Sequence, residues 1–235
     1  MIKNILIKIR RQDTPFYAAV YRYGKILRQL NLPYIPFVHD VLKYERIIRI
    51  NLWNKLTSTL YYEPIFKSYC NVFGRNLRLV GGIPLVMGSA YIELGNSVTL
   101  HGATTIVGAK ITDNPKLIIG NNTHLGYQVE VYIGGNVTIG NDVLIANRVS
   151  FVGYDFHPID PIKRKNNEPA DASGSGDITI GDNVWIGMNC IILKNVTIGE
   201  NAIIGAGSLV KEDIPANSIA VGSPAKVVRT LKESI

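Results

Sequence analysis

The chain has 235 residues, 46% of them hydrophobic, which is enough for one large domain with a sizeable core and no apolar run long enough to cross a bilayer. Its two cysteines, Cys70 and Cys190, are too few for a disulfide framework, and Cys190 is expected to be a buried thiol in a reducing compartment. The net charge of +7 is uneven, because residues 1–80 hold 14 Lys and Arg against 4 Asp and Glu, whereas residues 81–235 hold 11 against 14.

Residues 1–78 are expected to form a basic, aromatic-rich helical region. Asp13-Thr14-Pro15 is typical of a helix start, since proline fits the first helical position, and apolar residues at helical spacing follow up to Leu30. A second helical pattern runs from about Phe37 to Leu60. The charges on both sides of the short apolar patch at the start do not indicate a secretory signal.

The basic helical region has two open interpretations. Basic amphipathic helices with Tyr and Trp suit an anionic membrane surface, so residues 1–60 are expected to support peripheral membrane association. Alternatively, the helices pack on the rest of the chain or on a neighbouring subunit, with Lys and Arg solvated. No nucleic-acid partner is expected, because no recognised binding motif accompanies the charge.

Residues 79–214 follow a six-residue period that is clearest between Ile178 and Asp213. The aliphatic anchors of that stretch are Ile180, Ile186, Ile192, Ile198, Ile204 and Val210. The residues three positions after the first five anchors are Asn or Gly, which tolerate left-handed backbone at a bend. Each hexapeptide therefore predicts a short strand plus a corner, and stacked coils would bury one aliphatic column, as in hexapeptide β-helices. About five to six coils are expected.

The repeat stops between Phe151 and Ile178, and the inserted loop of residues 153–177 is the candidate site of chemistry. Long loops inside compact domains are usually functional or disordered. The loop holds His157, and histidine near a carboxylate is the commonest general base near neutral pH. Asp155 or Asp160 is expected to orient its ring, with Asp155 preferred.

From about Ile139 to Arg229 the chain resembles the hexapeptide-repeat acyltransferases. Within that family it is similar to sugar O-acetyltransferases of the galactoside and maltose type and to relatives from polysaccharide biosynthesis. The pieces that carry the resemblance are VTIGNDVLIANRVSF, FHPIDPIKR, ITIGDNVWIG and VTIGENAIIGAGSLVKEDIPANSIAVGSPAKVVR. The resemblance implies an all-β solenoid, a left-handed parallel β-helix that assembles as a homotrimer with active sites between subunits. It also implies acetyl-coenzyme A as the donor.

The resemblance also assigns residues. His157 matches the catalytic histidine, Arg164 matches the arginine seven residues later, and Tyr154 and Trp185 are expected on the acceptor side. The coenzyme is expected to contact Gly187, Met188, Gly205, Ala206, Lys211, Lys226 and Arg229. Glu212 departs from the basic residue that relatives often carry, and the stretch from His124 to Gly135 lacks the Asn and Asp that bind sugar in the galactoside enzymes. Residues 215–235 are expected to form a coenzyme-contacting tail with a short helix after Pro224.

The period also sorts the outward side chains into three columns. Thr138, Thr179 and Thr197 form a polar column on one face, and Ser150, Ile191 and Leu209 are the outward residues of another face. The third column, Leu144, Trp185 and Ile203, is apolar, which suggests a subunit interface or a coenzyme groove; a Trp shielded by the C-terminal tail is the alternative. No metal is expected, because His101, His124 and His157 include no closely spaced pair.

Three functional hypotheses follow. The first is a cytoplasmic acetyl-coenzyme A-dependent O-acetyltransferase, associated with the inner membrane face, that acts directly on a sugar hydroxyl of a surface polysaccharide, glycan or precursor. The second is a serine O-acetyltransferase or an N-acetyltransferase for a nucleotide-linked amino sugar. The third is a non-catalytic membrane-associated solenoid. The loop around His157 favours the first two, and the basic N-terminal region favours the first.

Overall fold

The computed structural model describes residues 2–231 and divides the chain into two compact units, Met1–Ile50 and Asn51–Ile235. The first unit is helical, with α1 (Ile2–Arg11), α2 (Pro15–Arg28) and most of α3 (Pro36–Thr57). The predicted start of α2 is confirmed, because Thr14 Oγ1 accepts a hydrogen bond from the Tyr17 N–H at 3.3 Å and Pro15 occupies the first turn. Helix α1 lies in the region that was expected to be helical, although no helical pattern was identified before Asp13.

No residue of α2 or α3 is buried. Residues 1–50 hold ten Lys and Arg against three Asp and Glu, a balance of +7. Large apolar side chains stay exposed beside these charges, including Phe16 at 70% and Leu27 at 71%. Over the described residues, no helix combines the length and the apolar character that a bilayer crossing needs.

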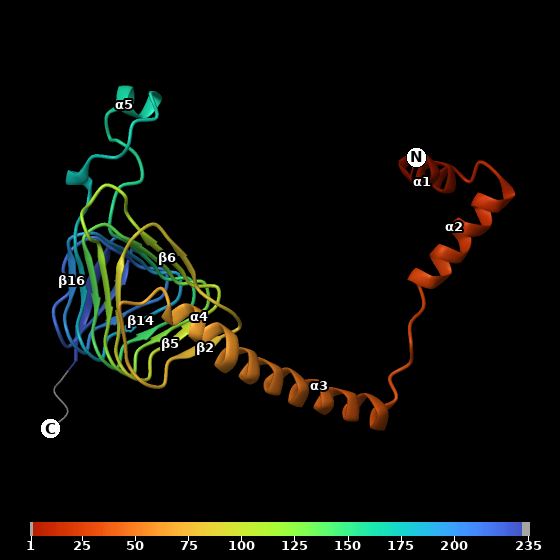
Figure 1. The fold of residues 1–235 in the computed structure, drawn as a ribbon, viewed down its shortest axis with the longest axis horizontal. Helices are drawn as coiled ribbons and strands as arrows, with labels where there is room; N and C mark the ends of the chain where they lie inside the picture. Colours follow the sequence, from red (N-terminus) through yellow and green to blue (C-terminus); the bar gives the residue numbers. More distant parts are fainter. Residues whose placement is uncertain (1, 232–235) are drawn as a thin grey trace. The chain divides into compact units, whose positions relative to one another are not determined.

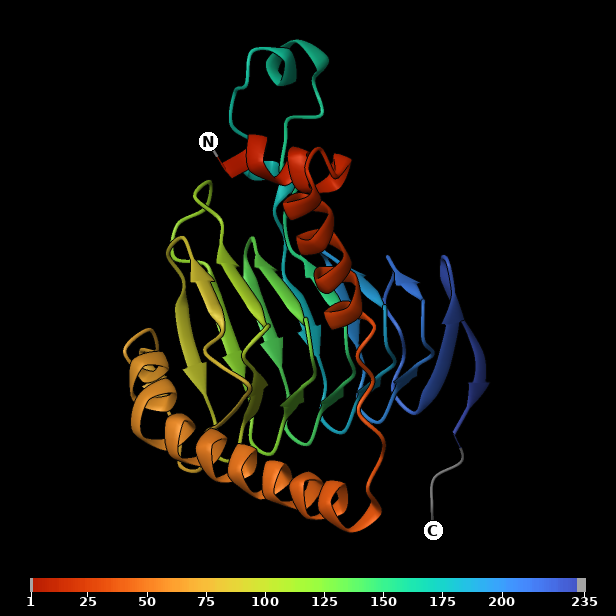
Figure 2. The same cartoon turned by 90° about the vertical axis from the view of Figure 1, so that its right-hand side faces the viewer.

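The second unit is a parallel β-helix, as the hexapeptide period predicted, and it is left-handed, as the family resemblance implied. Its strands stack coil upon coil into three sheets (Figures 1 and 2). Sheet A contains β1 (Val72–Phe73), β4 (Tyr91–Leu94), β7 (Lys116–Ile119), β10 (Asn136–Ile139), β13 (Ile178–Ile180) and β16 (Val196–Ile198). Sheet B contains β2 (Arg78–Val80), β5 (Thr99–His101), β8 (His124–Leu125), β11 (Leu144–Ile145), β14 (Trp185–Ile186), β17 (Ile203–Ile204), β19 (Ser218–Gly222) and β20 (Ala225–Thr230). Sheet C contains β3 (Leu85–Met87), β6 (Thr105–Gly108), β9 (Glu130–Ile133), β12 (Ser150–Val152), β15 (Ile191–Leu193) and β18 (Leu209–Val210).

The core is the aliphatic column that the six-residue step predicted. All six anchors between Ile180 and Val210 are at most 1% exposed, and so are the residues two positions before each of them. Strand side chains alternate between the two faces of a sheet, so each short strand sends its outer residues inward and its middle residue to solvent. The first coil begins at Val72, before the expected start at residue 79.

The corners of the solenoid depend on residues that adopt left-handed backbone. Asn183, Asn189, Asn195 and Asn201 have φ values between 53° and 60°, and Gly207 has a φ of 73°. One corner is further tied by stacked polar side chains, since Asn121 donates to Asn141, and Asn141 in turn donates to Asp182. At that corner a Cβ on Gly120 would lie 2.6 Å from the backbone of Gly140, so only glycine allows the coils to approach this closely.

Both ends of the solenoid are covered. At the first coil, η1 (Ser58–Tyr62) and α4 (Glu63–Lys67) place Phe66 in the core, and Ser58 Oγ donates to Leu79 O at 2.9 Å. At the last coil, β19 and β20 form an antiparallel hairpin. The short helix expected after Pro224 is therefore wrong. The segment from Ala225 to Thr230 is rich in β-branched residues and extends the open edge of sheet B instead.

Candidate active site

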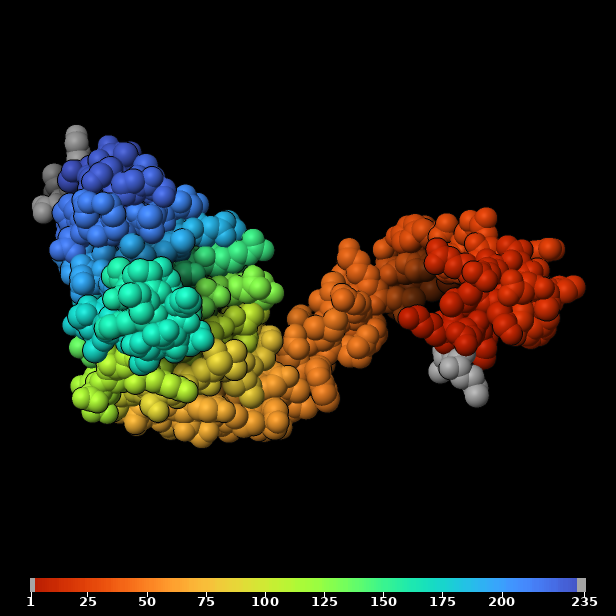
Figure 3. Space-filling view, turned by 90° about the horizontal axis from the view of Figure 1, so that it is seen from above, coloured from red at the N-terminus to blue at the C-terminus, as the bar shows by residue number. Residues whose placement is uncertain are grey.

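The loop of residues 153–177 leaves the solenoid at the corner between sheets C and A, from the end of β12 to the start of β13. It rises above the surface of the solenoid (Figures 1 and 3). Its two legs pair at the base, since the Asp155 N–H donates to Gly174 O at 3.0 Å and the Gly176 N–H donates to Gly153 O at 2.9 Å. Helix α5 (Pro161–Lys165) and η2 (Ala172–Gly174) lie within it. The loop is a folded structure with a hydrogen-bonded base.

His157 lines a cavity of about 160 Å³ at the base of this loop. The other lining residues are Asp155, Pro158, Ile159, Asp171, Ser173, Gly174 and Lys194. The structure thus brings together His157 and Asp155, the two residues that the sequence assigned to catalysis. Lys194 comes from the next coil, after β15, and was not predicted. Its signal was available in the repeat, because the pairing of Val152 with Leu193 places Lys194 at the corner where the loop begins.

The carboxylate of Asp155 is held by Lys194. The Nζ atom of Lys194 lies 2.6 Å from Asp155 Oδ2 and also donates to Gly174 O at 2.6 Å. Within residues 2–231 no hydrogen bond joins either Asp155 or Asp160 to the ring of His157. Asp160 is instead the N-cap of α5, because its Oδ1 accepts hydrogen bonds from the N–H groups of Ile162 and Lys163. Those two backbone donors hold the pKa of Asp160 below its ordinary value.

Arg164 holds the segment that follows His157. Its Nη1 atom donates to Pro158 O at 2.8 Å and to Ile159 O at 2.9 Å. A guanidinium that bridges two successive carbonyl groups restricts the backbone beside the histidine. This geometry gives Arg164 a positioning role, and its contact with substrate stays a prediction.

An aromatic cluster supports the opposite side of the loop base. The rings of Tyr132 and Phe156 meet edge to face with centroids 4.9 Å apart, and the centroids of Tyr154 and Phe156 are also 4.9 Å apart. Burial raises the pKa of Tyr154. Tyr154 therefore packs beside the histidine segment, and Phe156, which stays 49% exposed, lies within the same cluster.

Trp185 and several of the residues predicted to contact the coenzyme lie on or beside sheet B, and not in the His157 loop. The register pairs Leu144 with Trp185 and Trp185 with Ile203, which confirms the apolar column, and Trp185 is 53% exposed. Gly187 and Met188 follow β14 at the corner between sheets B and C. They stack on Gly205 and Ala206 of the next coil, where the Gly187 N–H donates to Ile204 O at 2.8 Å.

The three basic residues expected at the coenzyme phosphates do not form one group. Lys211 and Lys226 both pair with Glu212, at 3.3 Å and 3.1 Å, and these lysines hold the pKa of Glu212 below its ordinary value. Arg229 lies on β20, paired in register with Ile219. The departure noted at Glu212 therefore has a structural consequence, because its carboxylate sits between two of the cations expected to meet phosphate. In the described part of the chain, no group of three or more metal-ligating side chains comes together.

Comparisons with known proteins agree with this architecture. The family model "Bacterial transferase hexapeptide (six repeats)" matches residues 177–212. The galactoside O-acetyltransferase of Escherichia coli K12 is 43% identical over 115 residues, which are 49% of this chain and 54% of that protein. The polysialic acid O-acetyltransferase of Escherichia coli O1:K1 is 41% identical over 134 residues, which are 56% of this chain and 42% of that protein.

A solved galactoside acetyltransferase in complex with coenzyme A superposes with a TM-score of 0.51 and 30% identity, over 73% of this chain and 70% of that one. The chain belongs to the hexapeptide-repeat acetyltransferase family. It spans about half the length of the first two curated relatives.

Proposed function

We propose that this protein is an acetyl-coenzyme A-dependent O-acetyltransferase that acts on a sugar hydroxyl of a cell-surface polysaccharide, a glycan or a precursor of one. The observation that carries the proposal is the cavity around His157 in the loop that interrupts an otherwise regular solenoid. Two relatives support it, since one is named for acetyl transfer to galactosides and the other for acetyl transfer to polysialic acid.

The proposed reaction is a direct transfer in a ternary complex. Neutral His157 accepts the proton of the acceptor hydroxyl while the hydroxyl oxygen forms a bond to the thioester carbonyl carbon. The tetrahedral intermediate collapses as the carbon–sulfur bond breaks, and the proton passes from His157 to the departing thiolate. A backbone N–H stabilises the oxyanion, and we assign this donor to Met188, whose N–H has no protein acceptor among residues 2–231.

The proposed active site needs a second copy of the chain. The chain runs from sheet A to sheet B to sheet C, so the corner that carries His157 faces away from sheet B. Trp185 is on sheet B, and Met188 is at the corner where sheet B meets sheet C. A single subunit therefore cannot bring these residues to His157. The exposed column of Leu144, Trp185 and Ile203 gives a neighbouring subunit an apolar surface to cover, and we propose a homotrimer with one site at each interface.

The coenzyme is proposed to lie along the corner formed by Gly187, Met188, Gly205 and Ala206. Gly187, Gly205 and Ala206 have little or no side chain, which leaves room for an extended pantetheine chain. Lys211, Lys226 and Arg229 would meet the phosphates, with Glu212 moving aside from the two lysines to which it is paired. The acceptor side is assigned to Tyr154, Arg164 and Trp185, with Asp155 beside His157 at the reacting hydroxyl.

The first unit is proposed to hold the enzyme at the inner face of the membrane. Its charge of +7 and its exposed apolar side chains are the properties of helices that lie in the interface of an anionic bilayer. This location would suit an acceptor that is itself lipid-linked.

The proposal is tested by an acceptor screen. Purified full-length protein, acetyl-coenzyme A and a panel of monosaccharides and glycans are incubated, free thiol is measured, and products are examined by mass spectrometry for the gain of one acetyl group. Acetyl transfer to a sugar hydroxyl is the expected result. Transfer only to serine or to an amino sugar nitrogen would overturn the proposed acceptor class.

A further inference from the structure

A second and larger pocket opens at the corner that carries the His157 loop. Its volume is about 520 Å³. It lies between the turn that joins β3 to β4 and the loop of residues 109–115 that joins β6 to β7, both of which connect sheet C to sheet A. The repeat does not need this loop, because the coil from β9 to β10 passes the same corner through Gly134-Gly135 alone.

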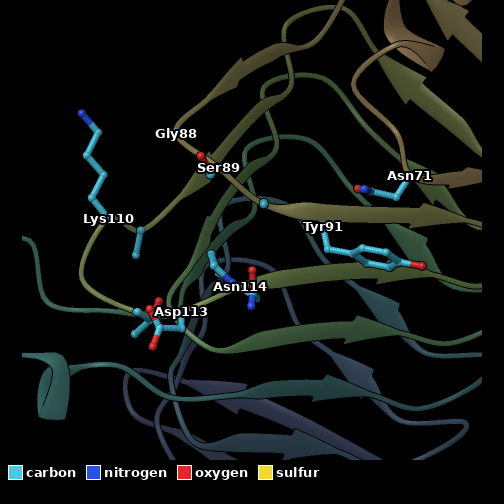
Figure 4. Close-up of a pocket in the computed structure, with 11 residues that line it drawn as sticks. Asn71, Gly88, Ser89, Tyr91, Lys110, Asp113 and Asn114 are labelled. Carbon is cyan, nitrogen blue, oxygen red and sulfur yellow. The ribbon is translucent and has the colours of Figure 1, made fainter.

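The pocket is lined by polar side chains, and among the described residues the fold leaves two of them, Asp113 and Asn114, without a protein partner. Asp113 and Asn114 lie together on one side, and Asn71 and Tyr91 lie on the other (Figure 4). Within residues 2–231, the side chains of Asp113 and Asn114 make no hydrogen bond or ion pair to protein. A carboxylate and an amide can accept and donate hydrogen bonds to adjacent hydroxyl groups, and the tyrosine adds an apolar ring surface. This combination suits a sugar residue.

A hydrogen bond and a close packing contact link the pocket to the His157 loop. Thr112 Oγ1 donates to Gly134 O at 2.5 Å, which ties the pocket loop to the next coil. Gly134 in turn lies against Gly153, the first residue of the His157 loop, where a Cβ on Gly153 would be 2.8 Å from Gly134 N. Successive coils are about 4.8 Å apart, and the His157 loop follows β12, two coils beyond the loop of residues 109–115 that follows β6.

We propose that this pocket is a subsite for a second sugar residue of the acceptor, so that the enzyme recognises a glycan chain lying along the corner between sheets C and A. The inference rests on the proposed sugar O-acetyltransferase activity and deepens it. A chain that occupies the subsite would present a neighbouring residue to His157. Binding energy from the remote residue would then position the reacting hydroxyl, which a free monosaccharide could not achieve.

The test uses galactose and β-linked galactose oligomers of two to six residues with the full-length protein. We measure acetylation by thiol release and binding by calorimetry, for the wild type, Asp113→Ala and the control Glu200→Ala. Glu200 is an exposed acidic residue at a different corner, between β16 and β17. The wild type should show kcat/KM rising about tenfold or more between one and three residues. Asp113→Ala should lose that rise with little change for galactose, and Glu200→Ala should keep it.

The outcomes separate this inference from the proposed function. Acetylation that does not depend on chain length, or an Asp113→Ala variant with the length dependence of the wild type, overturns the subsite and leaves the acetyltransferase proposal intact. Oligomer binding that Asp113→Ala abolishes, without acetylation of any acceptor, supports the subsite and contradicts the activity. If the galactose oligomers neither bind nor react, the subsite is overturned, and the acceptor screen decides the acetyltransferase proposal separately.

Discussion

Lys194 Nζ lies 2.6 Å from Asp155 Oδ2, and this ion pair joins the His157 loop to the coil beneath it. The same ammonium group donates to Gly174 O, so one side chain holds both legs of the loop. Only 26% of the Lys194 side chain is exposed, which protects the contact from solvent better than a surface pair. The pair makes the position of His157 depend on a residue outside its loop.

Replacing Lys194 with Met should lower kcat by about ten- to hundredfold, because a small displacement of a general base is costly. The KM for acetyl-coenzyme A should change by less than about twofold, since the coenzyme is proposed to lie at a different corner. The matched control is Lys163→Met, which removes an exposed pair with Asp171 inside the loop and should change kcat little. Equal losses in the two variants would contradict this positioning role.

Adjacent residues on β15 test the core. Ile192 is fully buried and Ile191 is 42% exposed on the outer face. Ile192→Ala should lower the free energy of unfolding by about 2–5 kcal/mol, because it removes buried methyl groups and leaves a cavity. Ile191→Ala should cost less than about 1 kcal/mol. Urea unfolding at one fixed protein concentration measures both, and similar losses would show that the two residues do not face opposite sides.

The first unit should bind vesicles through its apolar side chains. Phe16→Ser with Leu27→Ser removes two exposed apolar groups from α2 without changing its charge, and each would contribute roughly 1.5–3 kcal/mol if fully buried in lipid. Sedimentation with vesicles containing phosphatidylglycerol should therefore show at least about a tenfold loss of affinity.

The control for vesicle binding changes two exposed apolar residues of the solenoid, Leu85→Ser with Met87→Ser, and should bind as the wild type does. Vesicles of phosphatidylcholine alone should bind the wild type weakly, because they lack the anionic charge that the basic helices match. Undiminished sedimentation of the α2 variant would show that these helices have another partner.

His124 should make the fold sensitive to mild acid. Burial, Arg78 and His101 lower the pKa of His124 below its ordinary value of 6.5. The unfolded chain then binds more protons than the folded chain once the pH falls below about 6.5, so stability decreases as the pH decreases. His124→Gln should reduce the fall in melting temperature between pH 7.5 and pH 5.5, and Arg78→Gln should reduce it in part. An unchanged fall in both variants would exclude this origin.

The sequence predicted the solenoid well because a short exact repeat encodes both faces of each strand. The six-residue period predicts the buried anchors, the left-handed Asn corners and the outward columns. The register pairs Thr138 with Thr179 and Thr179 with Thr197, as expected. The C-terminal hairpin was missed because the segment after Pro224 lies beyond the last regular hexapeptide. Its antiparallel pairing is set by the open edge of sheet B and not by a local pattern.

The sequence predicted only those site residues that stand out within a single segment of the chain. His157 stands out because its loop interrupts the period. Lys194 does not stand out, because its partner Asp155 is on the preceding coil and an ordinary corner lysine gives no local signal. Arg164 was assigned to substrate from its spacing, whereas its contacts with Pro158 O and Ile159 O depend on how the loop turns back on itself. Such loop contacts carry no periodic signature.

The most direct test of the account is the rate of thiol release from acetyl-coenzyme A by His157→Ala in the presence of a sugar acceptor that the wild type acetylates. Loss of the general base should lower kcat by about 10²–10⁴-fold while the protein still folds and binds the coenzyme. His39→Ala, which changes a half-buried histidine on α3 of the first unit, should keep the wild-type rate. Full activity in His157→Ala would contradict the proposed mechanism.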